Sequence, residues 1–206
     1  MKIAYIGASG EVGKRVVPEL VSRGHEVTAI STHPEAAPKM PGVTAVEGNI
    51  DDEEKMTELL KGHDVVISSV QFGKYDHAKL LGAVKNSGAP RYFVCGGSGT
   101  LLAPGSDTRI MDLPNFPEAA MQPALNAARF FDRLQAEKDL DWTFVSPPPP
   151  PGFSADAPRT GKYRLGKDHL LIGPDGKPGI SYEDYAIAIA DEITDRKHRG
   201  RFTVGY

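Results

Sequence analysis

The chain has 206 residues, of which 40% are hydrophobic, and its formal net charge is −3. This length and apolar content fit one domain with a proper core, and the scattered lysines and arginines exclude a basic nucleic-acid-binding surface. The absence of a long apolar stretch excludes a membrane span, and the dispersed histidines favour no metal site. A single cysteine, Cys95, excludes an internal disulfide; with no signal peptide predicted, we expect a cytoplasmic location.

The first predicted elements are a short apolar strand over residues 3–6, a glycine-rich turn and a helix over 11–23. Such a turn aims free backbone N–H groups and the positive end of a helix dipole at one point, which suits a pyrophosphate. We expect Gly7 to allow the sharp turn, Gly10 to let the backbone approach the phosphates, and Gly13 to let the helix pack close to the sheet. The turn therefore predicts a dinucleotide site.

Strands and helices then alternate as far as residue 146. The predicted strands cover 26–30, 43–46, 64–70, 91–95 and 141–145, and the predicted helices cover 53–61, 76–87 and 118–138. This alternation predicts an α/β fold with a Rossmann-type doubly wound parallel sheet, in which ligands bind at the carboxyl ends of the strands.

The remainder of the chain has a different pattern. The proline run 147–151 must be extended; strand-like pieces at 162–165 and 169–172, a helix over 182–195 with Ser181 as N-cap, and a final strand over 201–204 follow. We expect residues 1–206 to form a single NAD(P)-binding domain, with 147–206 as a small appendage on the substrate side.

The end of the second strand normally distinguishes NAD from NADP, because a carboxylate there binds the ribose 2′-OH and repels a 2′-phosphate. This strand ends in Ser31-Thr32-His33 without an acid, which favours NADP and leaves NAD possible. We expect Asn49 to hydrogen-bond the adenine. The predicted cofactor-binding residues lie in the glycine turn and at the strand ends: Gly7, Ser9, Gly10, Glu11, Val12, Gly13, Ser31, Thr32, His33, Asn49, Ile50, Ser68, Ser69, Val70, Gly96, Gly97, Ser146 and Pro147.

The chain has no obvious pair of residues for proton transfer. Short-chain dehydrogenases use a Tyr-x-x-x-Lys pair on the helix after the fifth strand, but residues 118–138 contain no tyrosine. Tyr75 and Lys79 have the required spacing, yet they follow the fourth strand, and we interpret that spacing as coincidence. Hydride transfer from a nicotinamide to an electron-poor ring needs less, since proximity and stacking supply most of the catalysis.

We expect that acceptor to bind in a substrate pocket that includes Ser98, which would orient it. The other predicted pocket residues are Phe72, Pro148 and Phe153. The alternative, that these apolar side chains simply pack a core or a lid, stays open.

The motif Gly-Ala-Ser-Gly-x-Val-Gly at residues 7–13 resembles that of atypical short-chain dehydrogenases of the NmrA-like, NAD(P)H-binding kind. Segments 95–105, 140–147, 160–166, 180–186 and 201–206 narrow the resemblance to bacterial NADH-flavin reductases, which are similar to biliverdin-IX-beta/flavin reductase. The resemblance implies a Rossmann fold, an NAD(P)H cofactor and flavin reduction. The chain departs from the family by lacking an arginine near Thr32 and by having Asn49 where aspartate is usual.

Two functional hypotheses follow. The first is an NAD(P)H-dependent reductase that transfers hydride to a flavin or quinone-like acceptor, and the alternative is a non-catalytic NADP(H)-binding redox sensor. An epimerase is disfavoured by the short C-terminal portion and the missing tyrosine. A small-molecule acceptor is the expected partner, with neither nucleic acid nor membrane, and the oligomeric state is not predicted.

Overall fold

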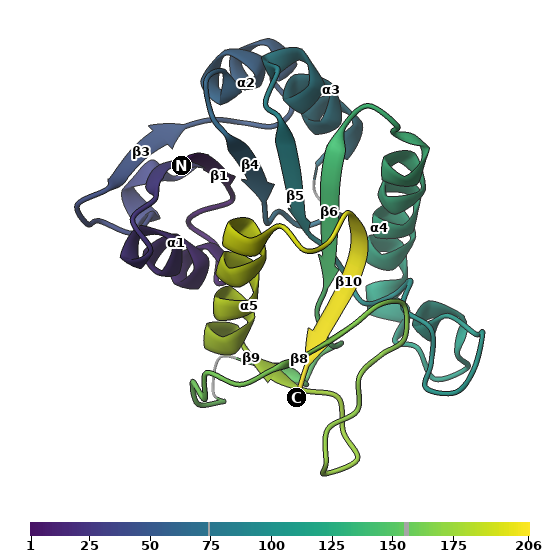
Figure 1. Ribbon diagram of the computed structural model, residues 1–206. Helices are drawn as coiled ribbons and strands as arrows, with labels where there is room; N and C mark the ends of the chain where they lie inside the picture. The colour runs from purple at the N-terminus through teal and green to yellow at the C-terminus, as the bar shows by residue number, and fades with distance from the viewer. Residues whose placement is uncertain (74, 155–156) are drawn as a thin grey trace. The chain divides into compact units, whose positions relative to one another are not determined.

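The computed structural model of the chain describes residues 1–73, 75–154 and 157–206 (Figure 1). The chain divides into two compact units. Unit 1 comprises Met1–Cys95 with Glu137–Trp142, and unit 2 comprises Gly96–Ala136 with Thr143–Tyr206. The C-terminal segment from residue 147 thus folds together with residues 96–136, and the predicted single domain stays a prediction.

Unit 1 contains a parallel sheet with the strand order β3-β2-β1-β4-β5. Its strands are β1 (Lys2–Ile6), β2 (Glu26–Ser31), β3 (Val43–Glu47), β4 (Val65–Ser68) and β5 (Arg91–Cys95). Every residue of β4 and β5 is buried, as expected for strands of a parallel sheet that is covered on both faces. The predicted parallel α/β sheet is confirmed.

The helices of unit 1 lie on both faces of this sheet (Figure 1). Right-handed crossovers place α1, which packs against β1 and β2, on one face, and α2 and α3, which pack together, on the other. These helices are α1 (Gly13–Ser22), α2 (Glu53–Leu60) and α3 (His77–Ser87), and a short 3-10 turn, η1, covers Pro34–Ala36. The side chains of Asp52 and Asp76 cap α2 and α3 by accepting N–H groups of their first turns.

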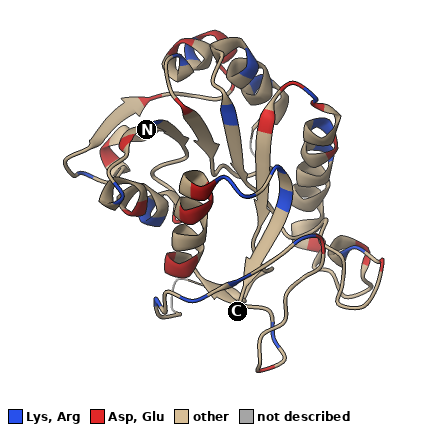
Figure 2. Ribbon diagram, in the orientation of Figure 1, with Lys and Arg blue, Asp and Glu red and all other residues tan. Residues whose placement is uncertain are grey.

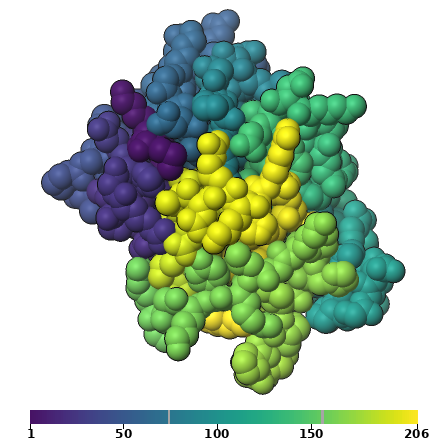
Figure 3. Space-filling model, viewed as in Figure 1, coloured from purple at the N-terminus to yellow at the C-terminus, as the bar shows by residue number. Residues whose placement is uncertain are grey.

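Unit 2 is built on β6 (Asp141–Ser146, which begins in unit 1) and β10 (Gly200–Gly205), which pair in parallel. The strand β8 (Arg164–Gly166) pairs with β10 in the antiparallel direction. Its remaining elements are η2 (Ile110–Asp112), α4 (Glu118–Ala136), β7 (Phe153–Ser154), β9 (Ile180–Ser181) and α5 (Tyr182–Asp195). In the space-filling view, the yellow residues of α5 and β10 form a continuous surface (Figure 3).

Several predicted elements have different bounds in the structure. The helix predicted over 11–23 begins at Gly13, and the fourth strand ends at Ser68 rather than at residue 70. The predicted strand at 169–172 is wrong: His169 makes only an isolated bridge with Leu102, because this segment pairs with a loop rather than with a sheet. The two-residue strands β7 and β9 are too short to leave a pattern in the sequence.

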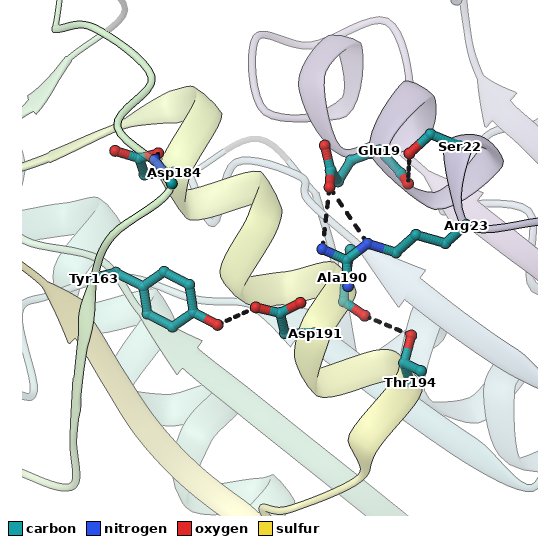
Figure 4. Close-up of polar contacts among 9 residues, drawn as sticks. Glu19, Ser22, Arg23, Tyr163, Asp184, Ala190, Asp191 and Thr194 are labelled. Atoms are coloured by element: carbon teal, nitrogen blue, oxygen red, sulfur yellow. Dashed lines mark hydrogen bonds and ion pairs between the residues drawn. The ribbon is translucent and has the colours of Figure 1, made fainter.

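The helix α5 begins and ends at the predicted residues. Ser181 is its N-cap and accepts the N–H of Asp184 at 3.0 Å. Acidic residues, red in Figure 2, occur along the length of this helix. Near its C-terminal end, Asp191 accepts a hydrogen bond from Tyr163, and Thr194 donates to the carbonyl of Ala190 at 2.9 Å (Figure 4).

Of the acids of α5, Glu192 and Asp184 are buried, and the side chain of Asp184 is fully buried. Its carboxylate accepts the hydroxyl of Thr160 at 2.7 Å, the N–H groups of Thr160 and Gly161 at 3.0 and 2.8 Å, and the hydroxyl of Tyr206 at 2.6 Å. One carboxylate therefore joins α5, the segment before β8 and the C-terminal residue. Burial by itself raises the pKa of Asp184, but the hydrogen bonds from Thr160, Tyr206 and Gly161 outweigh it and hold the pKa below its usual value.

The first prediction is that Asp184→Asn lowers the free energy of unfolding by about 2–3 kcal/mol at neutral pH, because an amide presents N–H donors to groups that also donate. Urea denaturation measures this loss. Because the folded-state pKa is depressed, the native stabilisation is present above the unfolded pKa of about 4 and is lost as the pH falls through the folded pKa. The variant should lack this pH dependence.

Tyr206→Phe is the matched control: it keeps the carboxylate, removes the hydroxyl that donates to it, and also removes the acceptor of the Ser181 N–H at 3.1 Å. We expect it to cost about 1–2 kcal/mol, because two hydrogen bonds are lost. An Asp184→Asn variant with native stability at pH 7 and the native acid response would contradict the assigned role of this carboxylate.

Candidate nucleotide and acceptor sites

The glycine turn after β1 is fixed by its neighbours in the sheet. Gly7 has a φ of +88°, and a Cβ there would lie 2.6 Å from the carbonyl oxygen of Ser69. The N–H of Gly7 donates to the carbonyl of Ile30 at 2.9 Å, and the N–H of Ser69 donates to that of Ile6 at 2.9 Å. Position 7 therefore requires glycine both for its backbone conformation and for its close approach to β4.

The other two glycines of the turn have different surroundings. A Cβ on Gly10 would meet only the carbonyl oxygen of Gly7, at 3.3 Å. A Cβ on Gly13 would lie 2.6–2.7 Å from backbone atoms of Gly7 and Ala8. Gly13 was predicted to let the helix pack close to the sheet. The nearest atoms instead belong to the turn, so Gly13 lets α1 begin directly against the turn. Gly10 is the position that keeps space open beside the turn.

Backbone donors gather at the start of α1. Within the described residues, the N–H groups of Ser9, Glu11 and Val12 have no acceptor. Val12 precedes the helix without a side-chain cap. The free N–H groups and the helix dipole produce a positive potential, so the residues of the turn are suited to bind a pyrophosphate.

A cavity of about 310 Å³ opens beside this turn in unit 1. Its walls come from the carboxyl ends of β1, β2, β3 and β4 and the loops that follow them. The lining residues are Ile6, Gly7, Ser9, Gly10, Ser31, Thr32, His33, Gly48, Ile50, Ser69, Val70, Gln71 and Tyr75. The structure thus brings together nine of the residues predicted from the sequence to bind the cofactor: Gly7, Ser9, Gly10, Ser31, Thr32, His33, Ile50, Ser69 and Val70.

The other cofactor residues predicted in unit 1 do not line this cavity. Glu11 is exposed and pairs with Arg15 at 2.5 Å and Lys14 at 3.4 Å, and these two cations lower its pKa. The hydroxyl of Ser68 is buried and bonds that of Tyr92 at 2.8 Å, so it faces the sheet. Val12 and Gly13 contribute backbone groups to the turn and do not line the wall of the cavity.

Asn49 has a local partner of its own. Its Oδ1 accepts the N–H of Asp51 at 3.0 Å, so the side chain closes the turn before α2. Asp51 in turn accepts the N–H of Asp76 at 3.3 Å, and its carbonyl accepts the Lys79 ammonium at 3.1 Å. The loops after β3 and β4, which both line the cavity, are thereby tied together.

Tyr75 is a lining residue that the sequence reasoning did not assign to the site. It precedes α3, which begins at His77, so Tyr75 and Lys79 do not lie on one helix as their spacing suggested. The predicted pocket residue Phe72 stacks on the ring of His77 with centroids 4.4 Å apart, and it does not line the cavity. The Tyr75-x-x-x-Lys79 spacing was the signal in the sequence that singled out Tyr75 within this loop.

The rim beside β2 carries hydroxyl and imidazole groups. The Ser31 side chain is buried and accepts the N–H of His33 at 3.2 Å. His33 is exposed and lies 3.5 Å from Glu35. None of the described residues that line the cavity is an acid.

A second cavity, of about 660 Å³, lies within unit 2. It is mostly apolar, and Ser98 is one of its few polar lining groups. The lining residues are Ser98, Ile110, Leu113, Asn115, Phe116, Pro117, Ala119, Ala120, Pro149, Pro150 and Leu170. Ser98 thus lines a mostly apolar cavity, and its predicted role in orienting an acceptor stays a prediction.

The remaining predicted residues of unit 2 have other surroundings. Phe153 packs edge-on against Tyr182 and Tyr185, with centroids 4.3 and 4.8 Å apart, so it belongs to an aromatic cluster and not to the cavity wall. Pro148 is buried outside the wall, as is Pro147. The alternative that the predicted pocket residues pack a core or a lid therefore applies to Phe153.

Three predicted cofactor residues are held by the sheet and α4 of unit 2. A Cβ on Gly96 would lie 2.0 Å from the ring of Phe144, so this glycine is required for packing. Gly97 is less constrained, since its Cβ would meet only the Ala127 methyl at 3.8 Å. The carbonyl of Ser146 accepts the hydroxyl of Thr203 at 2.8 Å.

The parallel sheet built from alternating strands and helices, together with the cavity beside the glycine turn, defines a Rossmann-type dinucleotide-binding protein. The family model described as NAD(P)H-binding matches residues 7–196, and the chain belongs to this oxidoreductase family of the atypical short-chain dehydrogenase kind. The predicted family and its nicotinamide cofactor are confirmed. In the described part of the chain, no helix combines the length and apolarity that a bilayer crossing needs.

Three relatives cover nearly the whole chain. The uncharacterised Bacillus subtilis protein YwnB is 36% identical over 215 residues, which cover 99% of this chain and 98% of its own. The structure of a candidate epimerase from Bacteroides thetaiotaomicron has a TM-score of 0.88 at 37% identity and covers 100% of this chain and 96% of that one. A candidate NADH-flavin reductase from Streptococcus pneumoniae has a TM-score of 0.84 at 34% identity, with coverage of 100% and 99%.

The second prediction is that Gly10→Val abolishes binding of NADPH and NADH while the protein stays folded. A valine side chain at position 10 would contact few protein atoms, but it would fill the space that a pyrophosphate would occupy. Calorimetric titration measures the affinity, thermal unfolding checks the fold, and Gly10→Ala should show a smaller loss. Undiminished affinity in a folded Gly10→Val protein would remove the turn from the site.

Proposed function

We propose that this protein is an NAD(P)H-dependent reductase that transfers hydride to a flavin or quinone-like acceptor. The observation that carries the proposal is the contrast between its two cavities. The cavity of unit 1 offers backbone donors and hydroxyls to a nucleotide, whereas the cavity of unit 2 is apolar and has no charged lining residue among those described. The relative from Streptococcus pneumoniae, a candidate NADH-flavin reductase, supports the same reaction.

The cofactor would be held by the residues of unit 1. The free N–H groups of Ser9, Glu11 and Val12 would bind the pyrophosphate, and Gly10 would let it approach. Ser31, Thr32 and His33 would face the adenosine ribose, and the lack of an acid among them favours NADP over NAD. Neutralising a 2′-phosphate would fall to Lys14 and Arg15, which both contact Glu11 and would have to exchange that partner.

The bound nicotinamide supplies a hydride, equivalent to two electrons and one proton, to the acceptor ring. This chain's contribution is to place the acceptor and exclude competing reactions, since no tyrosine occurs in α4 to move a proton. Ser98 lines the apolar cavity, and the structure gives its hydroxyl no hydrogen-bond partner among the described residues. It is therefore available to orient a carbonyl of the acceptor, while the second proton comes from solvent.

The third prediction concerns cofactor choice. NADPH should bind at least as well as NADH, and Ser31→Asp should shift the affinity ratio toward NADH by about tenfold, or about 1.4 kcal/mol, because a carboxylate repels the 2′-phosphate and accepts the 2′-OH. The isosteric control Ser31→Asn also preserves an acceptor for the His33 N–H but adds no charge, so the ratio should change little. A native preference for NADH of tenfold or more would refute this interpretation of Ser31-Thr32-His33.

The fourth prediction concerns turnover. NADPH oxidation should occur with free flavins or quinones and not with simple alcohols or nucleotide sugars, as followed by absorbance at the nicotinamide band. Ser98→Ala should lower the rate about three- to tenfold, the effect of losing one hydrogen bond of about 1 kcal/mol. Tyr75→Phe and Lys79→Ala should leave the chemical step nearly unchanged.

Two outcomes would point elsewhere. A large loss in the Tyr75 or Lys79 variant, with a silent Ser98→Ala, would reassign proton transfer to that pair. Saturable NADPH binding without turnover across the acceptor panel would support the redox-sensor alternative.

A further inference from the structure

The wall of the unit 2 cavity combines apolar side chains with two neutral polar groups. The lining residues Ile110 and Leu170 form a small buried cluster with Leu101, and the lining residues Leu113 and Phe116 pack against this cluster. The polar groups are the hydroxyl of Ser98 and the amide of Asn115, and neither has a side-chain hydrogen bond within the described residues. Such a wall suits a flat, apolar ring that carries carbonyl oxygens.

Two arginines of unit 2 are already paired with carboxylates. Arg109 adjoins the lining residue Ile110, but its guanidinium makes two hydrogen bonds to Asp112, at 2.6 and 3.2 Å. Arg201 of the same unit is nearly buried, and it contacts Asp168 at 2.7 Å and Thr100 at 2.9 Å. Neither arginine offers a free positive charge to a ligand.

The first turn of α4 contributes Ala119 and Ala120 to the wall, and the positive end of a helix dipole can attract an anion. Here Glu118 occupies the same turn, so a carboxylate already offsets that potential. The N–H of Ala120 also donates to the carbonyl of Pro117 at 3.0 Å. A dianionic phosphate in this cavity would therefore lose its hydration without gaining a cation or a free helix end, which is costly.

We propose that the unit 2 cavity is a binding site for an uncharged, carbonyl-bearing ring, namely a quinone or the unphosphorylated isoalloxazine of riboflavin, and that it discriminates against FMN. The inference rests on the proposed reductase function for its role but concerns binding itself. Ser98 and Asn115 would donate to ring carbonyls, and the apolar residues would cover the ring faces.

Riboflavin and FMN make a sharp test, because they differ only in the phosphate and both are fluorescent. Fluorescence quenching titrations of the full chain should give a dissociation constant for FMN at least about tenfold above that for riboflavin, or about 1.4 kcal/mol. A 1,4-naphthoquinone should compete with riboflavin. Equal or tighter binding of FMN, or no competition by the quinone, would overturn the proposal.

Two arginine variants test whether the preference for riboflavin over FMN arises at this cavity. Ala120→Arg adds a cation to the cavity wall and should reduce or abolish the preference for riboflavin over FMN. Gln122→Arg adds the same charge one half-turn away on α4, at an exposed residue outside the wall, and should leave the preference unchanged. If both variants change the ratio equally, net charge and not this cavity sets the preference, and the proposal fails.

Turnover separates this inference from the proposed function. If riboflavin binds with the expected preference but NADPH is not oxidised by any acceptor, the reductase function is wrong while the cavity assignment holds. If NADPH is oxidised equally well by riboflavin and FMN and their affinities are equal, the function holds and the cavity assignment is wrong.

Discussion

The parallel register of β1 between β2 and β4 is the constraint on which the nucleotide cavity depends. Ile6 lies opposite Ile30 on one side and Ser68 on the other, so the chain leaves all three strands at the same level. The bonds from Gly7 to Ile30 and from Ser69 to Ile6 extend this alignment into the loops. A slip of one residue would turn the side chains that face the cavity toward the opposite face of the sheet.

Unit 2 is organised by a different interaction. The buried carboxylate of Asp184 would be costly by itself, but hydrogen bonds from Thr160, Gly161 and Tyr206 replace the water that it loses. A neutral apolar residue could pack there, yet it would not accept several donors from two separate segments, residues 160–161 and residue 206. The carboxylate therefore determines where the chain before β8 and the C-terminal tyrosine are held, a role that apolar packing alone fills less specifically.

The two cavities also differ in electrostatic character, which bears on the chemistry. The nucleotide cavity is built largely from backbone donors at a helix start, where a negative charge is stabilised without a charged side chain. The unit 2 cavity has neither a charge nor a positioned acid or base in its described lining. The described lining of the unit 2 cavity therefore offers no strong proton donor to a bound molecule, and the reaction proposed above needs none.

The sequence by itself determined the features that depend on local backbone preferences. These include the glycine turn, the strand Arg91–Cys95, the Ser181 cap and the helix that follows it, because each is specified by residues close together in the chain. The family-like segments at 160–166, 180–186 and 201–206 were recognisable as motifs, but the hydrogen bonds by which Asp184 of the second segment joins the other two were not.

Only the tertiary structure decided which side chains face which space. It placed Tyr75 in the nucleotide cavity, set Gly13 against the turn instead of the sheet, and moved Phe153 from the expected pocket into an aromatic cluster. The physical reason is that a side chain's neighbours come from segments distant in the sequence, whose approach is set by sheet register and loop closure and leaves no local pattern.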